Sequence, residues 1–385
     1  MGYNTITPEF VEQLKAIAPG RVYTGADINE DYAHDEMPIY GKFNPEVVVE
    51  VISKEEDGVT CKIINGGVLG NKKSLSAPGV HLDIPFISKE DEEDIRYACN
   101  HDGDFLALSF VSTKEDLLEA KKIIEEENSD IKIISKIEST TGIENLKEIV
   151  ELSDGVMVAR GDLGVEAPME QIPFLQKAII KECRHQGKFC IVATEMLESM
   201  KKNARPTRAE VSDIANAVIN GTDAVMLSGE TTTGKFPSET VKYMADICEE
   251  AEKHLDYLIN IESTSTDVAG AIAASVVETS NLLDAKLIVA ATMSGLTARL
   301  ISNLRPRSLI LASTPSEKVA RSLALNAGVY PVLTNEYNST DEIVEDSIVK
   351  SKEFTSIVKD DLLIITGGFP NNAKTTNFMK IEKIN

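Results

Sequence analysis

The sequence predicts an α/β protein that contains two successive series of strands and helices. From about residue 86 onward, short apolar runs rich in β-branched residues alternate with segments of helical periodicity. Such runs are typical of buried parallel strands, because helices cover both faces of their sheet. With 385 residues, the chain is long enough for two or three domains. Repeated units of one strand and one helix imply a parallel sheet, which is either closed as a barrel or open.

The first series supplies five predicted strands. They are residues 105–111, 131–137, 155–159, 189–193 and 223–227, and helical periodicity follows them, for example at 114–127 and 237–256. In both closed and open parallel sheets, functional side chains gather at the carboxyl ends of the strands. The residues directly after each apolar run are therefore the first candidates for chemistry.

The second series follows a polar stretch at residues 260–266. A predicted helix at 267–283 leads to strands at 286–291, 308–312, 329–333 and 362–366. Thr314, Pro315 and Glu317 predict the start of another helix. In this prediction the threonine caps the helix, the proline occupies its first turn and the glutamate completes a capping box.

Charged side chains follow two strands of the first series. Lys136 and Glu138 are two residues apart, so on a strand they point to the same face. Asp162 follows the next strand and lies between Gly161 and Gly164, which let the backbone approach a ligand closely. Carboxylates in a site that also accepts a substrate favour Mg²⁺ or Mn²⁺ over zinc, whose usual ligands are cysteine and histidine. The alternative is an ordinary surface ion pair.

Composition argues against several classes of partner. A formal net charge of −23 argues against nucleic acid and against an anionic membrane surface. The sequence contains no signal peptide and no apolar run long enough to cross a bilayer, so we expect no membrane partner and a cytoplasmic protein. The five cysteines lack the spacing of metal sites and predict the reduced thiols of a cytosolic protein: Cys61, Cys99, Cys183, Cys190 and Cys248.

Several longer segments carry a resemblance to a known family. They are NGGVLGNKK (65–73), PGVHLDIP (78–85), LSFV (108–111), ISKIE (134–138), VMVARGDLGVE (156–166), ATEMLESM (193–200), RPTRAEVSDIANAV (205–218), MLSGET (226–231) and TPSEKVARSLAL (314–325). In order and spacing these segments resemble those of pyruvate kinases. The resemblance implies a partial (β/α)8 barrel of the TIM type with five of its eight strands. It also implies a C-terminal three-layer α/β domain with a mostly parallel sheet.

The resemblance also implies a division of the chain. Residues 47–80 would be a remnant of a β-rich lid domain, 81–260 a partial barrel with a magnesium and phosphoenolpyruvate site, and 263–385 a C-terminal α/β regulatory domain. Residues 1–46 are instead similar to the beginning of FAD-linked oxidases of the glycolate oxidase and D-lactate dehydrogenase type. The glycine-rich segments with which that family holds FAD are absent from the sequence, so we expect no FAD.

Five residues receive roles from the resemblance to pyruvate kinases. Glu138 and Asp162 would hold Mg²⁺ or Mn²⁺, and Lys136 would face the transferred phosphoryl group and then the enolate oxygen. The backbone N–H groups of Gly161 and Asp162 would receive the substrate carboxylate. Thr194 would complete the pocket and help deliver a proton to the enolate.

Charged residues near these five leave alternatives open. We expect Arg160 to brace the loop or a subunit contact rather than to touch substrate. Glu195 stands where the family has an amide, and it either perturbs the proton transfer or points outward. The segment 205–218 is either an ion-pair network that supports the site or a solvated helix start.

A further site is implied in the C-terminal domain. Thr292, Ser294, Gly295 and Thr297 follow a strand and open a helix, where hydroxyls and backbone amides can cradle a phosphate. In the family this position resembles the effector pocket for a sugar phosphate. The alternative is a plain turn between strand and helix with a serine cap.

The reaction implied by the resemblance is phosphoryl transfer from phosphoenolpyruvate to ADP, which gives pyruvate and ATP in glycolysis. Pyruvate kinases also carry Arg-x-Asn-x-Ser and Asp-Thr-Lys-Gly-Pro-Glu segments, which supply K⁺ ligands and an arginine for the phosphoryl group. Neither segment occurs in this sequence. K⁺ is expected for the family but its ligands are missing, so we expect impaired activity. The alternatives are an inactive remnant that keeps a regulatory domain, or a Mg²⁺-dependent enolising or lyase activity on a pyruvate-type substrate. The family also implies a homotetramer.

Overall fold

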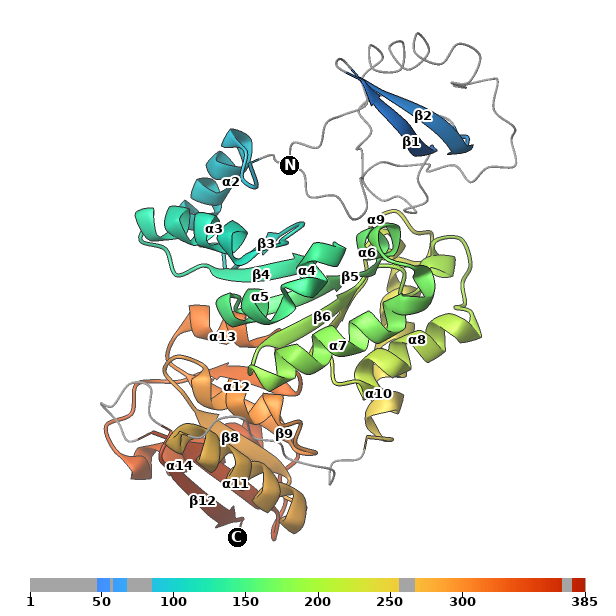
Figure 1. Cartoon of the computed structure of the whole chain (residues 1–385). Coiled ribbons are helices and arrows are strands. Elements are labelled where there is room, and N and C mark those ends of the chain that lie inside the picture. Colours follow the sequence, from blue (N-terminus) through green and yellow to red (C-terminus); the bar gives the residue numbers. More distant parts are fainter. Residues whose placement is uncertain (1–46, 56–57, 68–84, 256–266, 369–375, 385) are drawn as a thin grey trace.

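The structure, a computed structural model, describes residues 47–55, 58–67, 85–255, 267–368 and 376–384 (Figure 1). These residues form a two-stranded hairpin and two five-stranded sheets. The hairpin pairs β1 (Val48–Glu55) with β2 (Gly58–Asn65) in antiparallel fashion. It falls within the predicted lid remnant at 47–80, of which residues 68–80 lie outside the described part of the chain. The segment 1–46, expected to be similar to FAD-linked oxidases, also lies outside it.

The first five-stranded sheet is parallel throughout. Its strands follow one another in chain order: β3 (Phe105–Leu108), β4 (Lys132–Ile137), β5 (Gly155–Ala159), β6 (Phe189–Ala193) and β7 (Ala224–Met226). The five predicted strands are confirmed, and an open sheet with this order does not conflict with a partial barrel. The first strand ends earlier than the predicted 105–111, because Phe110 adopts a left-handed backbone conformation with φ of 56°.

Helices connect these strands (Figure 1). Three of them begin with capping boxes, in which the N-cap residues Ser88, Thr113 and Thr207 exchange hydrogen bonds with an acidic residue three positions later. The elements are α2 (Lys89–Asn100), α3 (Lys114–Glu126), α4 (Thr140–Glu144), α5 (Leu146–Leu152), α6 (Arg160–Glu166), η2 (Met169–Gln171), α7 (Ile172–His185), η3 (Glu198–Lys201), α8 (Arg208–Ile219), α9 (Gly229–Thr232) and α10 (Pro237–Glu252).

The two faces of the first sheet carry separate apolar clusters. Ile133 and Val192 belong to the cluster that packs against the helices, whereas Ile134 and Ile191 belong to a cluster on the opposite face. Side chains alternate between the faces of a strand, so Lys136 shares the face of Ile134. The polar side chains that follow β4 therefore lie at the end of the face that the helices do not cover.

The second sheet forms the middle of a three-layer unit, as predicted. Its order is β10-β9-β8-β11-β12, and all neighbours are parallel except the antiparallel pair β11 and β12. Helices α11, α12 and α13 contribute to the cluster on one face, while α14 contributes to the cluster on the other. The elements are α11 (Val268–Leu283), β8 (Leu287–Ala291), α12 (Leu296–Asn303), β9 (Leu309–Thr314), α13 (Glu317–Leu323), β10 (Val329–Leu333), α14 (Thr340–Phe354), β11 (Leu362–Gly367) and β12 (Phe378–Lys383).

Two sequence interpretations of this unit need correction. The predicted strands did not include β12, whose residues alternate between apolar and charged at the edge of the sheet. The predicted cap of α13 was also wrong. Thr314 still belongs to β9, and Ser316 is the N-cap, because its hydroxyl accepts a hydrogen bond from the N–H of Val319 at 3.3 Å.

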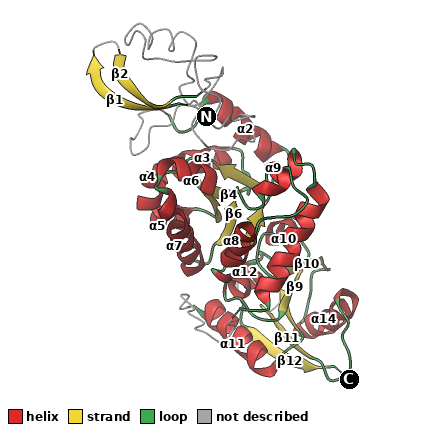
Figure 2. Cartoon of the chain, turned by 90° about the vertical axis from the view of Figure 1, so that its right-hand side faces the viewer, coloured by secondary structure: helices red, strands yellow, loops and turns green. Residues whose placement is uncertain are grey.

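A buried carboxylate connects the unit built on the first five-stranded sheet with the C-terminal unit built on the second. Asp223, directly before β7, accepts hydrogen bonds from the N–H groups of Cys190 at 3.0 Å and Ala327 at 3.1 Å. It also pairs with Arg305 at 3.0 Å. Arg305 and Ala327 come from the second unit, which Figure 2 shows below the first. One side chain therefore holds β6 and two segments of the C-terminal unit together.

Candidate functional site

Lys136 and Glu138 form an ion pair at the end of β4. The ammonium Nζ of Lys136 lies 2.8 Å from Oε1 of Glu138, and the glutamate side chain is fully buried while the lysine remains about a quarter exposed. The prediction that both side chains share one face of the strand is confirmed. A buried carboxylate beside a partly exposed cation is unlike the solvated pair that was the alternative.

The end of β3 contacts both of these side chains. The hydroxyl of Ser109 accepts a hydrogen bond from Lys136 Nζ at 2.6 Å, and the N–H of Phe110 donates to Glu138 Oε2 at 2.6 Å. Sequence reasoning missed both residues. The predicted strand 105–111 included both, and the available signal was the polar Ser109 inside that run, since β3 and β4 are parallel neighbours and their carboxyl ends meet.

Asp162 lies in the first turn of α6, directly after β5. Because β5 pairs with β4, its carboxyl group lies close enough to that of Glu138 for the two groups to interact electrostatically. Burial raises the pKa of Glu138 to about 7, against the lowering effect of Lys136, and the charge of Asp162 adds to the rise. Burial raises the pKa of Asp162 as well.

The two carboxylates fit a divalent cation. Burial raises the pKa of both groups, and the charge of Asp162 adds to the rise at Glu138, so a bound cation would relieve both effects. Among the described residues, no group of three or more His, Cys, Asp or Glu side chains is placed to hold a metal ion. Two protein carboxylates are nevertheless enough for Mg²⁺, which completes its shell with water and substrate oxygens.

Thr194 follows β6 in a strained conformation. Its φ is 70° and that of Glu195 is 54°, a region that β-branched residues rarely adopt. The Thr194 hydroxyl donates to the carbonyl of Ala193 at 2.6 Å and accepts from the N–H of Gly161 at 2.9 Å. In this arrangement the Gly161 N–H, which was expected to receive a substrate carboxylate, already has a partner in the site. Glu195 is exposed, which agrees with the outward-pointing alternative.

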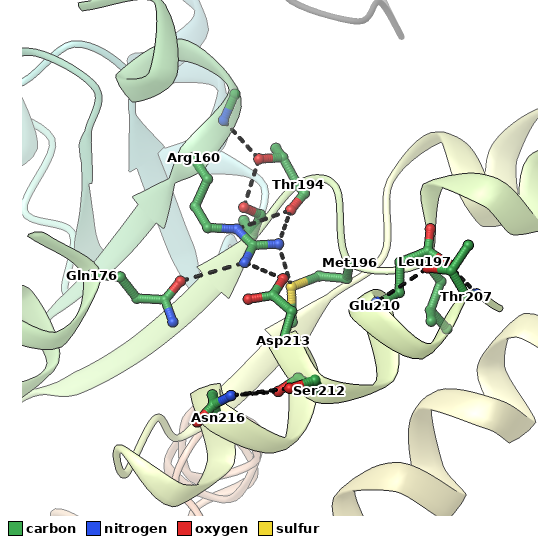
Figure 3. A network of polar contacts seen from close by, with 12 residues as sticks. Arg160, Gln176, Thr194, Met196, Leu197, Thr207, Glu210, Ser212, Asp213 and Asn216 are labelled. Carbon is green, nitrogen blue, oxygen red and sulfur yellow. Dashed lines mark hydrogen bonds and ion pairs between the residues drawn. The ribbon is translucent and has the colours of Figure 1, made fainter. Parts of the chain in front are cut away.

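Arg160 braces this turn, as Figure 3 shows. Its guanidinium is buried, with 8% of the side chain exposed, and donates to the carbonyl of Thr194 through Nε at 3.2 Å and Nη2 at 2.5 Å. Its Nη1 pairs with Asp213 of α8 at 2.5 Å. Asp213 thus joins the segment 205–218 to the loop by one ion pair, whereas Arg205 and Arg208 of that segment are exposed. The expectation that Arg160 braces the loop agrees with these contacts.

The second sheet carries the candidate effector cradle after β8. Thr292 and Thr297 are buried, and the Thr297 hydroxyl shares a hydrogen bond with that of Thr376 at 2.6 Å. Gly295, not Ser294, is the N-cap of α12, and no side chain caps that helix. The alternative, a plain turn with a serine cap, is therefore wrong about the cap, whereas a plain turn with Gly295 as N-cap agrees with the structure.

Strand order adds a physical argument for a ligand at this cradle. β8 has β9 on one side and β11 on the other, and the helices that leave β8 and enter β11 lie on opposite faces of the sheet. The chain order of the strands reverses between β8 and β11, and ligands of open α/β sheets bind beyond the carboxyl ends of the strands at such a point. The positive φ of Gly295, 80°, lets the backbone turn at this edge.

None of the described helices is both long and apolar enough to cross a membrane.

Family models match two parts of the chain. A model described as pyruvate kinase, barrel domain, matches residues 44–241, and one described as pyruvate kinase, alpha/beta domain, matches residues 270–382. The first match ends within α10 and the second begins within α11. None of the matches supports the expected similarity of residues 1–46 to FAD-linked oxidases.

Individual relatives agree with these models. Pyruvate kinases of Staphylococcus epidermidis and Staphylococcus aureus are 46% identical to the chain over 344 residues, which cover 88% of the chain and 59% of each relative. The chain therefore spans about three fifths of the length of these curated relatives. The crystal structure of a pyruvate kinase from Cryptosporidium parvum superposes with a TM-score of 0.83 at 39% identity, covering 88% of the chain and 71% of that protein. With both family models matched in order, and strand ends that carry the predicted lysine and carboxylates, the chain belongs to the pyruvate kinase family.

Proposed function

We propose that this chain binds phosphoenolpyruvate or pyruvate with a divalent cation, and that its reaction is the transfer of a phosphoryl group from phosphoenolpyruvate to ADP. The observation that carries the proposal is the convergence of Lys136, Glu138 and Asp162 at neighbouring strand ends. The named relatives are pyruvate kinases, and this chain spans about three fifths of their length.

Each residue of the site has a role in this proposal. Lys136 stabilises negative charge on the phosphoryl group and then on the enolate oxygen, in a position that Ser109 fixes. Thr194 delivers a proton to the enolate carbon. The N–H groups of Gly161 and Asp162 receive the substrate carboxylate, which requires the Thr194 hydroxyl to turn away from Gly161.

Glu138 and Asp162 would hold Mg²⁺ or Mn²⁺ in this site. The cation supplies positive charge that stabilises phosphate and carboxylate oxygens of the substrate. The family also implies K⁺, but the segments that supply its ligands do not occur in the sequence. The arginine that the family places at the transferred phosphoryl group is missing with them. We therefore propose that phosphoryl transfer by this chain is strongly impaired, because removing one transition-state partner costs about a hundredfold or more, roughly 3 kcal/mol.

We propose further that the C-terminal unit, residues 263–385, is regulatory and that a sugar phosphate binds at Thr292, Ser294, Gly295 and Thr297. The reversal of strand order between β8 and β11 supports this proposal, because ligands of open α/β sheets bind at such points. A homotetramer like that of the family remains a prediction. A cytoplasmic location is consistent with cysteines that are all unpaired in the described structure.

Two measurements test the proposed function. Isothermal calorimetry should detect Mn²⁺ binding, and oxalate binding in the presence of Mn²⁺, by the unmodified chain, and Glu138→Gln should weaken both. A coupled assay with phosphoenolpyruvate, ADP, Mg²⁺ and K⁺ should give a rate at least about a hundredfold below that of the Staphylococcus aureus enzyme assayed in parallel. Turnover equal to that enzyme would contradict the impairment. Absence of all binding would contradict the site.

A second candidate function is a metal-dependent enolising or lyase activity on a pyruvate-type substrate. It is favoured by the presence of Lys136, Glu138, Asp162 and Thr194 in a sequence without the family's phosphoryl-binding arginine segment. Exchange of the pyruvate methyl protons with deuterium oxide, followed by NMR, distinguishes the two. Exchange without phosphoryl transfer supports enolisation alone, and binding without either reaction identifies an inactive remnant.

A further inference from the structure

We propose that Asp213 is a positioning residue for the candidate site, which acts through Arg160 to hold Thr194 in its left-handed conformation. Asp213 lies on α8 and touches neither Lys136 nor the two carboxylates in any contact of the described residues. The inference rests on the proposed function, because it assigns a consequence to the position of Thr194 and Gly161.

Arg160 carries a buried positive charge that needs a partner. Its side chain is buried, and Asp213, which is 38% exposed, is the one charged partner that the described part of the chain gives it. The remaining contacts of the guanidinium are neutral: the carbonyl of Thr194, the sulfur of Met196 and the amide oxygen of Gln176. A buried cation without its carboxylate would shift or draw in water. Asp213 therefore determines where the guanidinium lies.

The guanidinium of Arg160 holds the backbone of Thr194 in an unusual conformation. Thr194 and Glu195 are successive residues with positive φ, and a β-branched residue enters that region only at a cost in free energy. Two donors of Arg160 converge on the carbonyl of Thr194, while the next residue, Gly161, donates to its hydroxyl. In the ligand-free chain the beginning of α6 therefore contacts both the carbonyl and the hydroxyl of Thr194, and Figure 3 shows the contacts of Arg160.

Helix α8 is also attached to the other end of the same loop, at Ser199. Glu210 accepts hydrogen bonds from the N–H of Ser199 at 2.7 Å and from its hydroxyl at 2.6 Å. Glu210 and Asp213 are three residues apart, so they lie on one face of the helix. One face of α8 therefore holds the loop 194–199 at both ends, directly at Ser199 and through Arg160 at Thr194.

The test compares three variants of the full chain by calorimetry. In Asp213→Asn, which keeps the size of the side chain, the affinity for oxalate in the presence of Mn²⁺ should fall about tenfold, equal to roughly 1.4 kcal/mol. The affinity for Mn²⁺ alone should stay unchanged, because Glu138 and Asp162 are untouched. Asp213→Glu should restore part of the oxalate affinity. Asn216→Ala, at an exposed position on the same helix whose side chain hydrogen-bonds only to Ser212 among the described residues, is the control and should bind like the unmodified chain.

Two results would overturn the proposal. One is unchanged oxalate binding by Asp213→Asn. The other is an equal loss of Mn²⁺ and oxalate binding, which would show a general structural role.

A second measurement separates this inference from the proposed function. If the unmodified chain binds no oxalate, the proposed function fails, and the methyl resonance of Thr194 in the ligand-free chain then decides the inference. This resonance, assigned with Thr194→Ser, should shift or broaden in Asp213→Asn and stay in place in Asn216→Ala. An unchanged resonance in Asp213→Asn would overturn the role of Asp213.

Discussion

Three non-glycine residues with left-handed backbones, Phe110, Thr194 and Glu195, stand at the carboxyl ends of β3 and β6. Each such position costs about 1–2 kcal/mol and persists only where neighbouring contacts hold it. Here the contacts come from the candidate site, since Phe110 donates its N–H to Glu138 and Thr194 offers its carbonyl to Arg160. The strained backbone positions and the side chains of Glu138 and Arg160 therefore hold each other in place through these hydrogen bonds.

Ser109 offers a test of how Lys136 is held. Ser109→Ala removes the hydroxyl that accepts the ammonium hydrogen bond at 2.6 Å, while Glu138 remains as its partner. We expect the affinity for oxalate with Mn²⁺ to fall about tenfold, since a hydrogen bond to a charged group contributes about 1.5–3 kcal/mol. Calorimetry measures the change. Ser109→Thr keeps the hydroxyl and should bind nearly normally, and equal binding by the alanine variant would show that Glu138 alone positions the lysine.

The raised pKa of Glu138 predicts a dependence of stability on pH. Between its ordinary value of 4.5 and about 7, an unfolded chain has ionised this carboxyl while the folded chain keeps the proton. The metal-free protein therefore loses stability from this group as pH rises through that window. Mg²⁺ binds the ionised carboxylate, so its stabilising effect should be larger at pH 8 than at pH 5.5.

Thermal unfolding with and without Mg²⁺ at the two pH values checks this prediction. Glu138→Gln, which cannot ionise, serves as the control and should show a smaller decline of stability with pH and lose most of the Mg²⁺ effect, while Asp162, whose pKa is also raised, keeps part of the decline. A Mg²⁺ effect of the same size at both pH values in the unmodified chain would contradict the assignment of the cation to Glu138.

At the scale of single elements, helix starts decide local stability. α13 begins at Ser316, whose hydroxyl accepts from the N–H of Val319, rather than at Thr314, which lies in β9. We expect Ser316→Ala to lower the free energy of unfolding by about 1 kcal/mol, because one N–H of the first turn loses its acceptor. Urea denaturation measures the difference. Ser316→Asp retains an acceptor and should keep the stability, whereas an alanine variant as stable as the unmodified chain would argue against the cap.

At the scale of the whole molecule, Asp223 joins the two units. Asp223→Ala would leave Arg305, which is only 14% exposed, as a nearly buried cation without its carboxylate. Breaking a buried pair in this way costs about 3–5 kcal/mol. We expect a loss of that size in chemical denaturation, with the two units unfolding separately.

Asp102→Ala is the matched control for the contact between the units. Asp102 pairs with Arg321 across the same two units, but the two side chains are 70% and 40% exposed, and solvent weakens such pairs. The control should leave the denaturation midpoint unchanged. Equal effects of the Asp102 and Asp223 variants would show that Asp223 has no special role between the units.

Local sequence determined the strands and the residues that follow them. Apolar runs end at charged positions in both β4 and β5, and the two-residue period of a strand places Lys136 and Glu138 on one face. Because β5 pairs with β4 in parallel, Asp162, which follows β5, then lies near these two side chains. The α/β class followed from the same patterns, whereas the three-layer C-terminal unit was implied by the resemblance to pyruvate kinases. The exception, β12, alternates polar and apolar residues at a sheet edge and lacks the continuous apolar run of the buried strands.

Tertiary structure alone decided which side chains support this site. Ser109 meets Lys136 across 27 residues, Arg160 meets Thr194 across 34 and Asp213 across 53, and such contacts depend on strand register and helix packing. The raised pKa of Glu138 likewise arises from burial and from a neighbour on another strand. A sequence pattern reports the period and polarity of its own segment. Hydrogen-bond partners and the loss of solvent are properties of several segments packed together, so only the folded chain determines them.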